Sequence, residues 1–409
     1  MSKINIHNAY LGIILFLLIS ISIFEIHFLL YLGTFFIYYA KVSKKVIDVI
    51  SFLILIVIIG VISSFFNDVK LYDWIKDFTY LSKPIIGILA GFLISKKINN
   101  FKYIIRIIIS ISVLFAIYHI LLILLKVDFS TSSVSDLRRI GGTSNEIEAF
   151  AIMLLLASWK IKEINVIKNI FYKKIILIIL VISFSLYLSR TMIVSELILL
   201  LAAFGYLRVT SKGIKYASLV ILFFGLFYVY LFNADIKRDQ SGFESFLYKM
   251  KIAPIEIFSP PKTIDTKNHA KLWDQWRAYE ANMAINQIDS YASFIIGKGF
   301  GALVDLKFAA PLGESNIRFI PILHNGYINI FFKSGILGVI IYVLLLLILY
   351  LKVNIKTQNQ QKRFTYNLIG GLAVHYLFTT LIVTGIYNLS EFYVFILGVL
   401  LYHSKEKEN

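Results

Sequence analysis

The chain has 409 residues, of which 58% are hydrophobic, and its mean hydropathy is +0.77. Many apolar runs approach the ~20 residues that cross a bilayer as a helix, which excludes a soluble globule and a disordered chain. The net charge is +17, but the basic residues are spread over short segments between apolar runs. That distribution indicates membrane topology and argues against nucleic acid as a partner.

The apolar runs predict an all-α, polytopic membrane protein with about twelve transmembrane helices. A β-barrel would show short alternating segments instead. We expect the first run to stay as a helix, because no convincing cleavage site follows it. The chain has no cysteine, so disulfides and thiol nucleophiles are excluded. The expected spans are 9–24, 26–40, 46–66, 81–95, 103–126, 146–159, 174–189, 191–207, 216–233, 325–351, 365–385 and 390–403.

Basic residues cluster in alternate connections, which the positive-inside rule places in the cytoplasm. The clusters lie at 41–45, 96–102, 160–174, 208–215 and 352–363. Both termini are then cytoplasmic, and the long segment before His324 lies outside. We expect three parts: residues 1–233 with nine helices, residues 234–323 as one large extracytoplasmic loop, and residues 324–409 with three helices and a cytoplasmic tail.

The third outer connection contains Arg138-Arg139-Ile140-Gly141-Gly142-Thr143-Ser144-Asn145. Its glycines let backbone N–H groups approach an anion, and its arginines suit phosphate geometry. The alternative is a flexible polar turn whose arginines anchor the membrane interface. Farther along, the tight hairpin Ser189-Arg190-Thr191 forces Arg190 close to the membrane surface. Arg190 can bind a phosphate there, or it snorkels to lipid headgroups.

The large loop has one segment, Lys271 to Ile288, with apolar residues at helical spacing. We predict an amphipathic helix that lies at the interface or caps a cavity, and it contains Arg277. The following run, Gly297-Lys298-Gly299-Phe300-Gly301, lacks the Lys-Ser/Thr ending of a P-loop. We therefore interpret it as a turn that positions the loop against the membrane helices rather than as a nucleotide site.

His324-Asn325 stands where the loop re-enters an apolar run, and Gly335-Ile336-Leu337-Gly338 follows nine residues later. A neutral histidine accepts a hydroxyl proton near pH 7; the alternative is an interfacial histidine bonded to backbone. The two glycines predict close helix packing. Lys333 either lines a wet cavity or marks a helix that begins outside the bilayer, and we favour the second.

Several other ionisable residues interrupt the apolar runs, and we assign none of them a catalytic role. They are Arg106, His119, Glu148, Glu196 and His375. Glu196 lies less than two helical turns from Arg190 and is a candidate partner for a cation. No set of His, Asp and Glu residues has the spacing of a metal site, so we expect neither a metal nor a cofactor.

In these motifs the chain resembles the O-antigen polymerase and O-antigen ligase family of bacterial membrane glycosyltransferases. His324-Asn325 through Gly338 fits the family pattern His-[Asn/Ser/Gln]-x9-Gly-x-x-Gly in spacing. The other matches are Ser189-Arg190, then Arg139 with Gly142 and Thr143, and Gly297 with Gly299. Two departures stand out. The family's Asn-Pro-Asn is here Asn145-Glu146-Ile147, and its loop basic residue before a tryptophan is matched by Lys271 rather than Arg277. We prefer Arg277 for that role, because arginine binds phosphate in a bidentate manner.

The resemblance implies a polysaccharide polymerase at the outer face of the inner membrane. It would transfer an oligosaccharide from undecaprenyl pyrophosphate to a hydroxyl of another lipid-linked repeat unit, in O-antigen or capsule assembly. Arg139, Arg190 and Arg277 would stabilise the leaving pyrophosphate in place of a metal, and His324 would accept the hydroxyl proton. Asn325 would orient His324 or the sugar, and Arg138, Lys271 and Asn145 would contact substrate.

Two alternatives stay open. A ligase would use the same motifs but transfer the glycan to lipid A core or protein. A transporter of the lipid-linked oligosaccharide is a different class, for which internal repeats are typical, and none is evident here. The polymerase interpretation implies three partners: the lipid-linked oligosaccharide, membrane lipid and a chain-length regulator protein.

Overall fold

The computed structural model describes residues 3–21, 23–127, 142, 145–238, 242–259, 269–312, 315–388 and 392–404. Its elements in chain order are α1 (Lys3–Ser20), α2 (Phe24–Ile37), α3 (Lys44–Ser64), α4 (Leu71–Ile98), α5 (Phe101–Lys126), α7 (Asn145–Ala157), η1 (Lys162–Ile164), α8 (Ile170–Leu186), α9 (Arg190–Ala203), α10 (Ser211–Asn233), α11 (Gly242–Phe258), α12 (His269–Asn286), α13 (Tyr291–Ile296), β1 (Val304–Leu312), β2 (Ser315–Ile320), α14 (Gly326–Leu351), η2 (Lys352–Asn354), α15 (Gln360–Ile382), η3 (Gly385–Tyr387) and α16 (Phe392–His403).

The protein is an all-α, multi-pass membrane protein, as the hydropathy predicts. Within the described residues, five helices are long and apolar enough to cross a bilayer: α3, α4, α5, α10 and α14. The twelve expected spans coincide in order with α1–α5, α7–α10 and α14–α16. One boundary differs clearly, because α4 begins at Leu71 rather than near residue 81. Its first turns contain the charged residues Asp73, Lys76 and Asp77, which lower the local hydropathy, so the hydropathy pattern does not predict this part of the helix.

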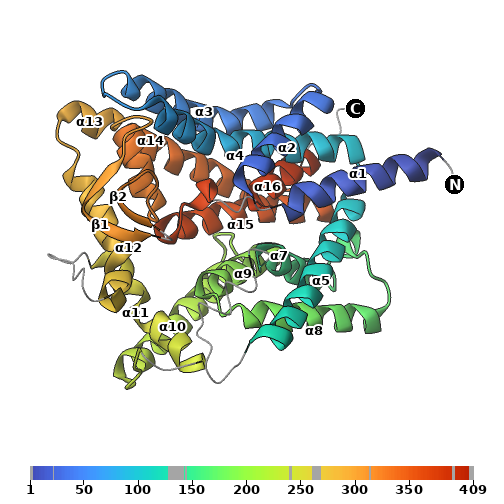
Figure 1. The fold of residues 1–409 in the computed structure, drawn as a ribbon. Coiled ribbons are helices and arrows are strands. Elements are labelled where there is room, and N and C mark those ends of the chain that lie inside the picture. The colour runs from blue at the N-terminus through green and yellow to red at the C-terminus, as the bar shows by residue number, and fades with distance from the viewer. Residues whose placement is uncertain are drawn as a thin grey trace.

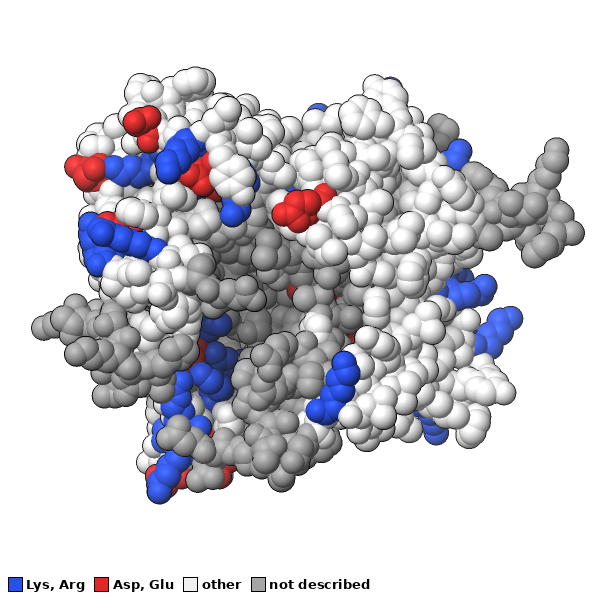
Figure 2. All heavy atoms as spheres, in the orientation of Figure 1, with Lys and Arg blue, Asp and Glu red and all other residues white. Residues whose placement is uncertain are grey.

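The helices form two groups that run roughly side by side (Figure 1). The first group contains α1–α4 and α14–α16, with α16 packed against α4 and α14 packed against α3 and α15. The second contains α5 and α7–α10, and α9 joins the groups by packing against α15. The segment 234–323 folds at one end of the bundle, here called the loop end, and both chain ends lie toward the other end (Figure 1). Most charged side chains on the face in Figure 2 lie toward these two ends, with largely uncharged surface between them.

The large loop has a core of its own, built on a two-stranded hairpin that the sequence analysis did not predict. Strand β1 pairs antiparallel with β2, with Val304 opposite Ile320. The expected amphipathic helix is α12, and its apolar face packs on this hairpin. Trp276 and Tyr279 are buried there, and the Tyr279 hydroxyl donates to the Leu306 carbonyl at 2.7 Å. The apolar side of α12 therefore covers protein rather than facing lipid.

The glycine run 297–301 fastens the loop to the membrane helices, as its structural interpretation predicts. Gly299 has φ +79°, and a Cβ there would lie 2.3 Å from the Ser64 backbone nitrogen. The Gly299 amide donates to the Lys333 carbonyl at 3.1 Å. Phe300 is fully buried, and its ring occupies the space left by the missing side chain of Gly60. The close backbone approach requires glycine at these positions.

Lys333 is buried in an ion pair, so it does not line a wet cavity, the less favoured of the two alternatives; that its helix begins outside the bilayer stays a prediction. Its side chain is 2% exposed and its ammonium group lies 2.5 Å from the Asp77 carboxylate and 2.5 Å from the Ala302 carbonyl. Asp77 also accepts the Gly301 amide at 2.7 Å. The ion pair therefore ties α4, α14 and the glycine run together. Just after it, α14 is interrupted at Gly335, which has φ +67° and touches the α13 backbone.

Candidate functional site

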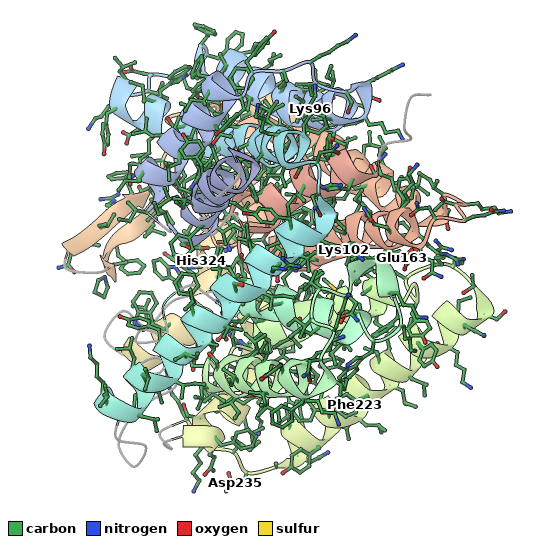
Figure 3. All side chains as sticks on the ribbon, turned by 90° about the vertical axis from the view of Figure 1, so that its right-hand side faces the viewer. Lys96, Lys102, Glu163, Phe223, Asp235 and His324 are labelled. Atoms are coloured by element: carbon green, nitrogen blue, oxygen red, sulfur yellow. The ribbon has the colours of Figure 1, made fainter. Side chains whose placement is uncertain are left out.

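His324 lies between the two helix groups, before the first turn of α14 (Figure 3). Its Nδ1 is 3.0 Å and 3.1 Å from the two carboxylate oxygens of Glu280, and its backbone amide donates to the same carboxylate. The Glu280 side chain is 1% exposed, whereas that of His324 is 48% exposed. The buried acid therefore fixes the imidazole and its loop, and Nδ1–H donates to Glu280. The Nε2 atom is then left as the proton acceptor.

A second cluster joins the two arginines that the sequence analysis singles out. The Glu256 carboxylate lies 2.5 Å from Arg190 and 2.7 Å from Arg277, and its side chain is 6% exposed. Arg190 also donates to the Lys249 carbonyl. Burial lowers the pKa of the Arg277 guanidinium, while the Glu256 and Glu280 carboxylates oppose that shift. Two cations and one buried anion leave a net positive charge in this cluster.

The two clusters meet on α12. Arg277 and Glu280 are three residues apart, which puts them on one face of that helix. Glu280 also acts electrostatically on Arg277. The structure thus brings His324, Arg190 and Arg277 into one region at the loop end, although they come from three separate parts of the chain.

The other residues predicted from the sequence lie partly at this site, partly elsewhere and partly outside the described residues. Asn325 caps α14, because its side chain accepts the Ile328 amide at 3.2 Å. That contact fixes the start of the helix directly after His324. Asn145 begins α7 and lines a cavity. Arg138, Arg139 and the side chain of Lys271 lie outside the described residues. Glu196 has no cation partner among the described residues, since Arg190 pairs with Glu256 instead.

Two cavities adjoin the arginine cluster, and Figure 2 shows a hollow between the helix groups with basic side chains beside it. The first cavity has a volume of about 280 Å³ and a mostly apolar wall. Arg190, Arg277 and Glu256 lie on its wall beside Phe224 and Phe378. The second has a volume of about 310 Å³ and a mixed polar and apolar wall from α7, α9, α15 and α16; because it is much the more polar of the two, it is here called the polar cavity. An apolar cavity that carries two guanidiniums suits an amphiphile with an anionic head.

Sequence reasoning missed Glu256 and Glu280, the two acids that organise the site. The spacing of Arg277 and Glu280 gives one available signal, since opposite charges three apart on a helix share a face. Glu256 gives no comparable signal, because α11 was not predicted. Its partner Arg190 lies 66 residues earlier in the chain.

Comparison with known proteins gives one family match. Residues 175–343 match the family model described as O-antigen ligase. The matched segment contains Arg190, Glu256, Arg277, Glu280 and His324. No curated protein matches the chain. The family consists of glycosyltransferase-like enzymes for which lipid-linked glycans are the substrates. The match over residues 175–343 supports the membership of this chain in the O-antigen ligase and polymerase family.

Proposed function

We propose that this protein is a polysaccharide polymerase. It transfers an oligosaccharide from undecaprenyl pyrophosphate to a hydroxyl group of a second lipid-linked repeat unit. The observation that carries the proposal is the junction on α12, where the His324–Glu280 pair adjoins the Arg190–Glu256–Arg277 cluster. This arrangement combines a proton acceptor with concentrated positive charge beside an apolar cavity.

The cluster and the cavity fit the two halves of the donor lipid. Arg190 and Arg277 bind the pyrophosphate, because guanidinium groups form bidentate contacts with phosphate oxygens. The apolar cavity takes the first isoprene units of the lipid, with Phe224 and Phe378 on its wall. Glu256 holds the two arginines in place while no phosphate is bound. In this proposal the arginines supply the positive charge that a metal ion supplies in many other glycosyltransferases.

His324 performs the proton transfer. The hydroxyl oxygen of the acceptor sugar forms a bond to the anomeric carbon, and the bond from that carbon to the pyrophosphate oxygen breaks. The hydroxyl proton passes to Nε2 of His324, and the bonding electrons leave with undecaprenyl pyrophosphate. Glu280 stabilises the imidazolium that results, in the role of the acid in a hydrolase triad. A single displacement of this kind inverts the anomeric configuration. Asn325 keeps the backbone beside His324 in place.

Reconstituted protein in lipid vesicles tests the proposal. With lipid-linked repeat units as substrate, the wild-type protein should lengthen the glycan and release undecaprenyl pyrophosphate. The variant His324→Ala should insert normally and lose about 10²–10⁴-fold in rate, the usual contribution of a general base. A normal chain-length ladder from this variant would exclude His324 as the base. Transfer that requires lipid A core or protein as acceptor would make the protein a ligase, and movement of the lipid without new linkages would make it a transporter.

We further propose that the loop end faces away from the cytoplasm, with both termini inside the cell. The alternating basic clusters support this orientation. In this arrangement a chain-length regulator would approach the loop end, where the product glycan grows. Single cysteines introduced into this cysteine-free chain, at Asn316 in β2 and Lys356 beyond α14, test the orientation in intact cells. A membrane-impermeant thiol reagent should label the first and not the second.

A further inference from the structure

The polar cavity of about 310 Å³ has no part in the proton transfer described above. It opens at the ends of α7 and α9, beside η3, and reaches α15 and α16. Its lining includes Asn145, Glu146, His375, Thr379, Asn388 and Tyr393. Two lining residues come from motifs identified in the sequence. Asn145 ends the motif that begins at Arg138, and Ser189 belongs to the Ser189-Arg190-Thr191 hairpin. The cavity is therefore assembled from segments far apart in the chain.

Buried polar groups face this cavity. His375 is 4% exposed, and its Nδ1 has no hydrogen-bond partner among the described residues. Glu146 is 8% exposed, and its carboxylate accepts a long hydrogen bond of 3.4 Å from the side-chain amide of Asn388. A buried imidazole nitrogen without a partner is costly, and the cost falls when a ligand supplies a hydrogen bond. The wall is thus prepared for a polar ligand.

The charges on the wall distinguish between polar ligands. Among the described lining residues there is no lysine or arginine, whereas Glu146 contributes a carboxylate. The described wall offers no cation to a phosphate, while neutral hydroxyl groups can donate to the carboxylate and to the imidazole nitrogen. The aromatic rings of Tyr376 and Tyr393 add flat apolar surface of the kind that packs on the C–H face of a sugar. The volume is at the lower end of the ~300–1,000 Å³ range of small-molecule sites, which suits a small polyol.

The polar cavity adjoins the apolar one through the packed pair α9 and α15. Thr191 lines both cavities and follows Arg190 directly. On α15, Ile382 lines the apolar cavity, and its neighbour Val383 lines the polar one. A ligand whose phosphate contacts Arg190 therefore has an apolar space on one side of the α9–α15 pair and a polar space on the other.

We infer that the polar cavity binds the monosaccharide joined directly to the pyrophosphate of the lipid-linked donor. The inference rests on the proposed function, because it requires the pyrophosphate at Arg190 and Arg277. The sugar occupies the pocket through its hydroxyl groups, with Glu146, Asn388 and His375 as partners. The pocket thereby selects the first sugar of the repeat unit, and it holds the anomeric carbon while the bond to phosphate breaks.

Cysteine protection tests this assignment, because the chain contains no cysteine of its own. The matched variants are Val383→Cys in the polar cavity and Ile382→Cys in the apolar cavity, both partly buried. Each is reconstituted in nanodiscs and treated with a small methanethiosulfonate reagent. The probes are undecaprenyl pyrophosphate without sugar and the lipid-linked oligosaccharide extracted from cells that lack this protein. At about ten times Kd, a bound ligand should slow the labelling of a covered cysteine about tenfold.

We expect both probes to protect Ile382→Cys, and only the sugar-bearing probe to protect Val383→Cys. If both probes protect Val383→Cys equally, or if neither does while Ile382→Cys is protected, the inference is wrong and the proposed function stands. If neither probe protects either cysteine, the proposed function fails as well. Asn145→Cys, at the start of α7, gives a second reporter in the polar cavity should Val383→Cys fold poorly.

A binding measurement gives an independent readout. Glu146→Gln keeps the shape of the side chain but removes its charge and one acceptor. This variant should bind undecaprenyl pyrophosphate as the wild type does and bind the lipid-linked oligosaccharide about tenfold more weakly, the effect of about 1.4 kcal/mol. Equal loss for the two probes, or no loss for either, would contradict a sugar in this pocket.

Discussion

Glu280 holds His324 at two points, the imidazole Nδ1 and the backbone amide. One buried carboxylate thus sets both the direction of the ring and the path of the chain into α14. The acid comes from the large loop, and the histidine stands at the start of a membrane helix. In the proposed mechanism the loop is therefore part of the reactive centre and does more than cover it.

Removing the charge of Glu280 should slow the transfer without abolishing substrate binding. In Glu280→Gln the imidazolium loses a charge-assisted hydrogen bond of about 1.5–3 kcal/mol, so kcat should fall about 10- to 150-fold. KM should change little, because Glu280 does not contact the donor lipid in this scheme. The measurement is the initial rate of glycan extension. Tyr279→Phe on the same helix is the control, since it removes a bond to the hairpin and should leave kcat unchanged; a normal kcat in Glu280→Gln would exclude the positioning role.

Neutralising Glu256 should destabilise the empty protein and increase its response to the product lipid. In Glu256→Gln, Arg190 and Arg277 face each other without their shared carboxylate, which should cost about 2–5 kcal/mol of folding free energy. A bound pyrophosphate then replaces the lost anion. Thermal unfolding in detergent, with and without undecaprenyl pyrophosphate, measures both effects. The control is Glu244→Gln in the first turn of α11; an unfolding shift on ligand addition no larger than in wild type would argue against phosphate at the two arginines.

Arg190 and Arg277 should act as a unit. Each single change to alanine leaves Glu256 with one partner, while the double change removes both. Because the arginines share one carboxylate and one ligand, their effects on binding of undecaprenyl pyrophosphate should deviate from additivity by about 0.5–3 kcal/mol. Equilibrium binding to the four proteins of the cycle gives this coupling. Strict additivity would mean that the two guanidiniums bind separate ligands or none.

The buried ion pair between Asp77 and Lys333 should matter for folding rather than for chemistry. Lys333→Met leaves the Asp77 carboxylate buried with the Gly301 amide as its one remaining partner among the described residues, which should cost about 3–5 kcal/mol. Adding Asp77→Leu should recover part of that loss, because the uncompensated charge is gone. Unfolding of the three variants in detergent tests the order. If the double variant is less stable than Lys333→Met, the loss of the bonds to the glycine run outweighs the burial of charge.

The ionised Asp305 carboxylate should stabilise the folded hairpin of β1 and β2 down to acidic pH. A hydrogen bond from Arg318 holds the pKa of Asp305 well below its usual value, so the folded hairpin favours the ionised form. That contribution is present above the unfolded pKa of about 3.9 and is lost only as the pH falls through the lower folded value. Hydrogen exchange of β1 and β2 between about pH 5 and pH 2 follows it. In Arg318→Ala, protection should be lower than in the wild type near pH 5, and the difference should shrink as the pH falls toward 2; equal protection at pH 5 would contradict the role of this pair.

Hydropathy predicted the helices well, because lipid-spanning segments require long apolar runs whatever their neighbours are. It failed at the start of α4, where a charged turn is stabilised by Lys333, a residue remote in sequence. The hairpin was missed because β1 contains Pro311, and a proline within a run argues against a strand. His324, Arg190 and Arg277 were predicted as site residues, because functional groups at a membrane boundary stand out against apolar sequence. Glu280 lies in polar sequence, where an acid is unremarkable until its burial is known, and the role of Glu256 depends on Arg190, a partner remote in sequence.

The large loop is held on both sides of the molecule. Its glycine run is locked to α3, α4 and α14, and its first helix is joined to α9 through Glu256 and Arg190. Any sideways parting of the helix groups must therefore pull on α12 and on the contacts of Arg277 and Glu280. Under the proposed function, entry of the donor lipid is thus mechanically linked to the positions of the arginines and of the proton acceptor.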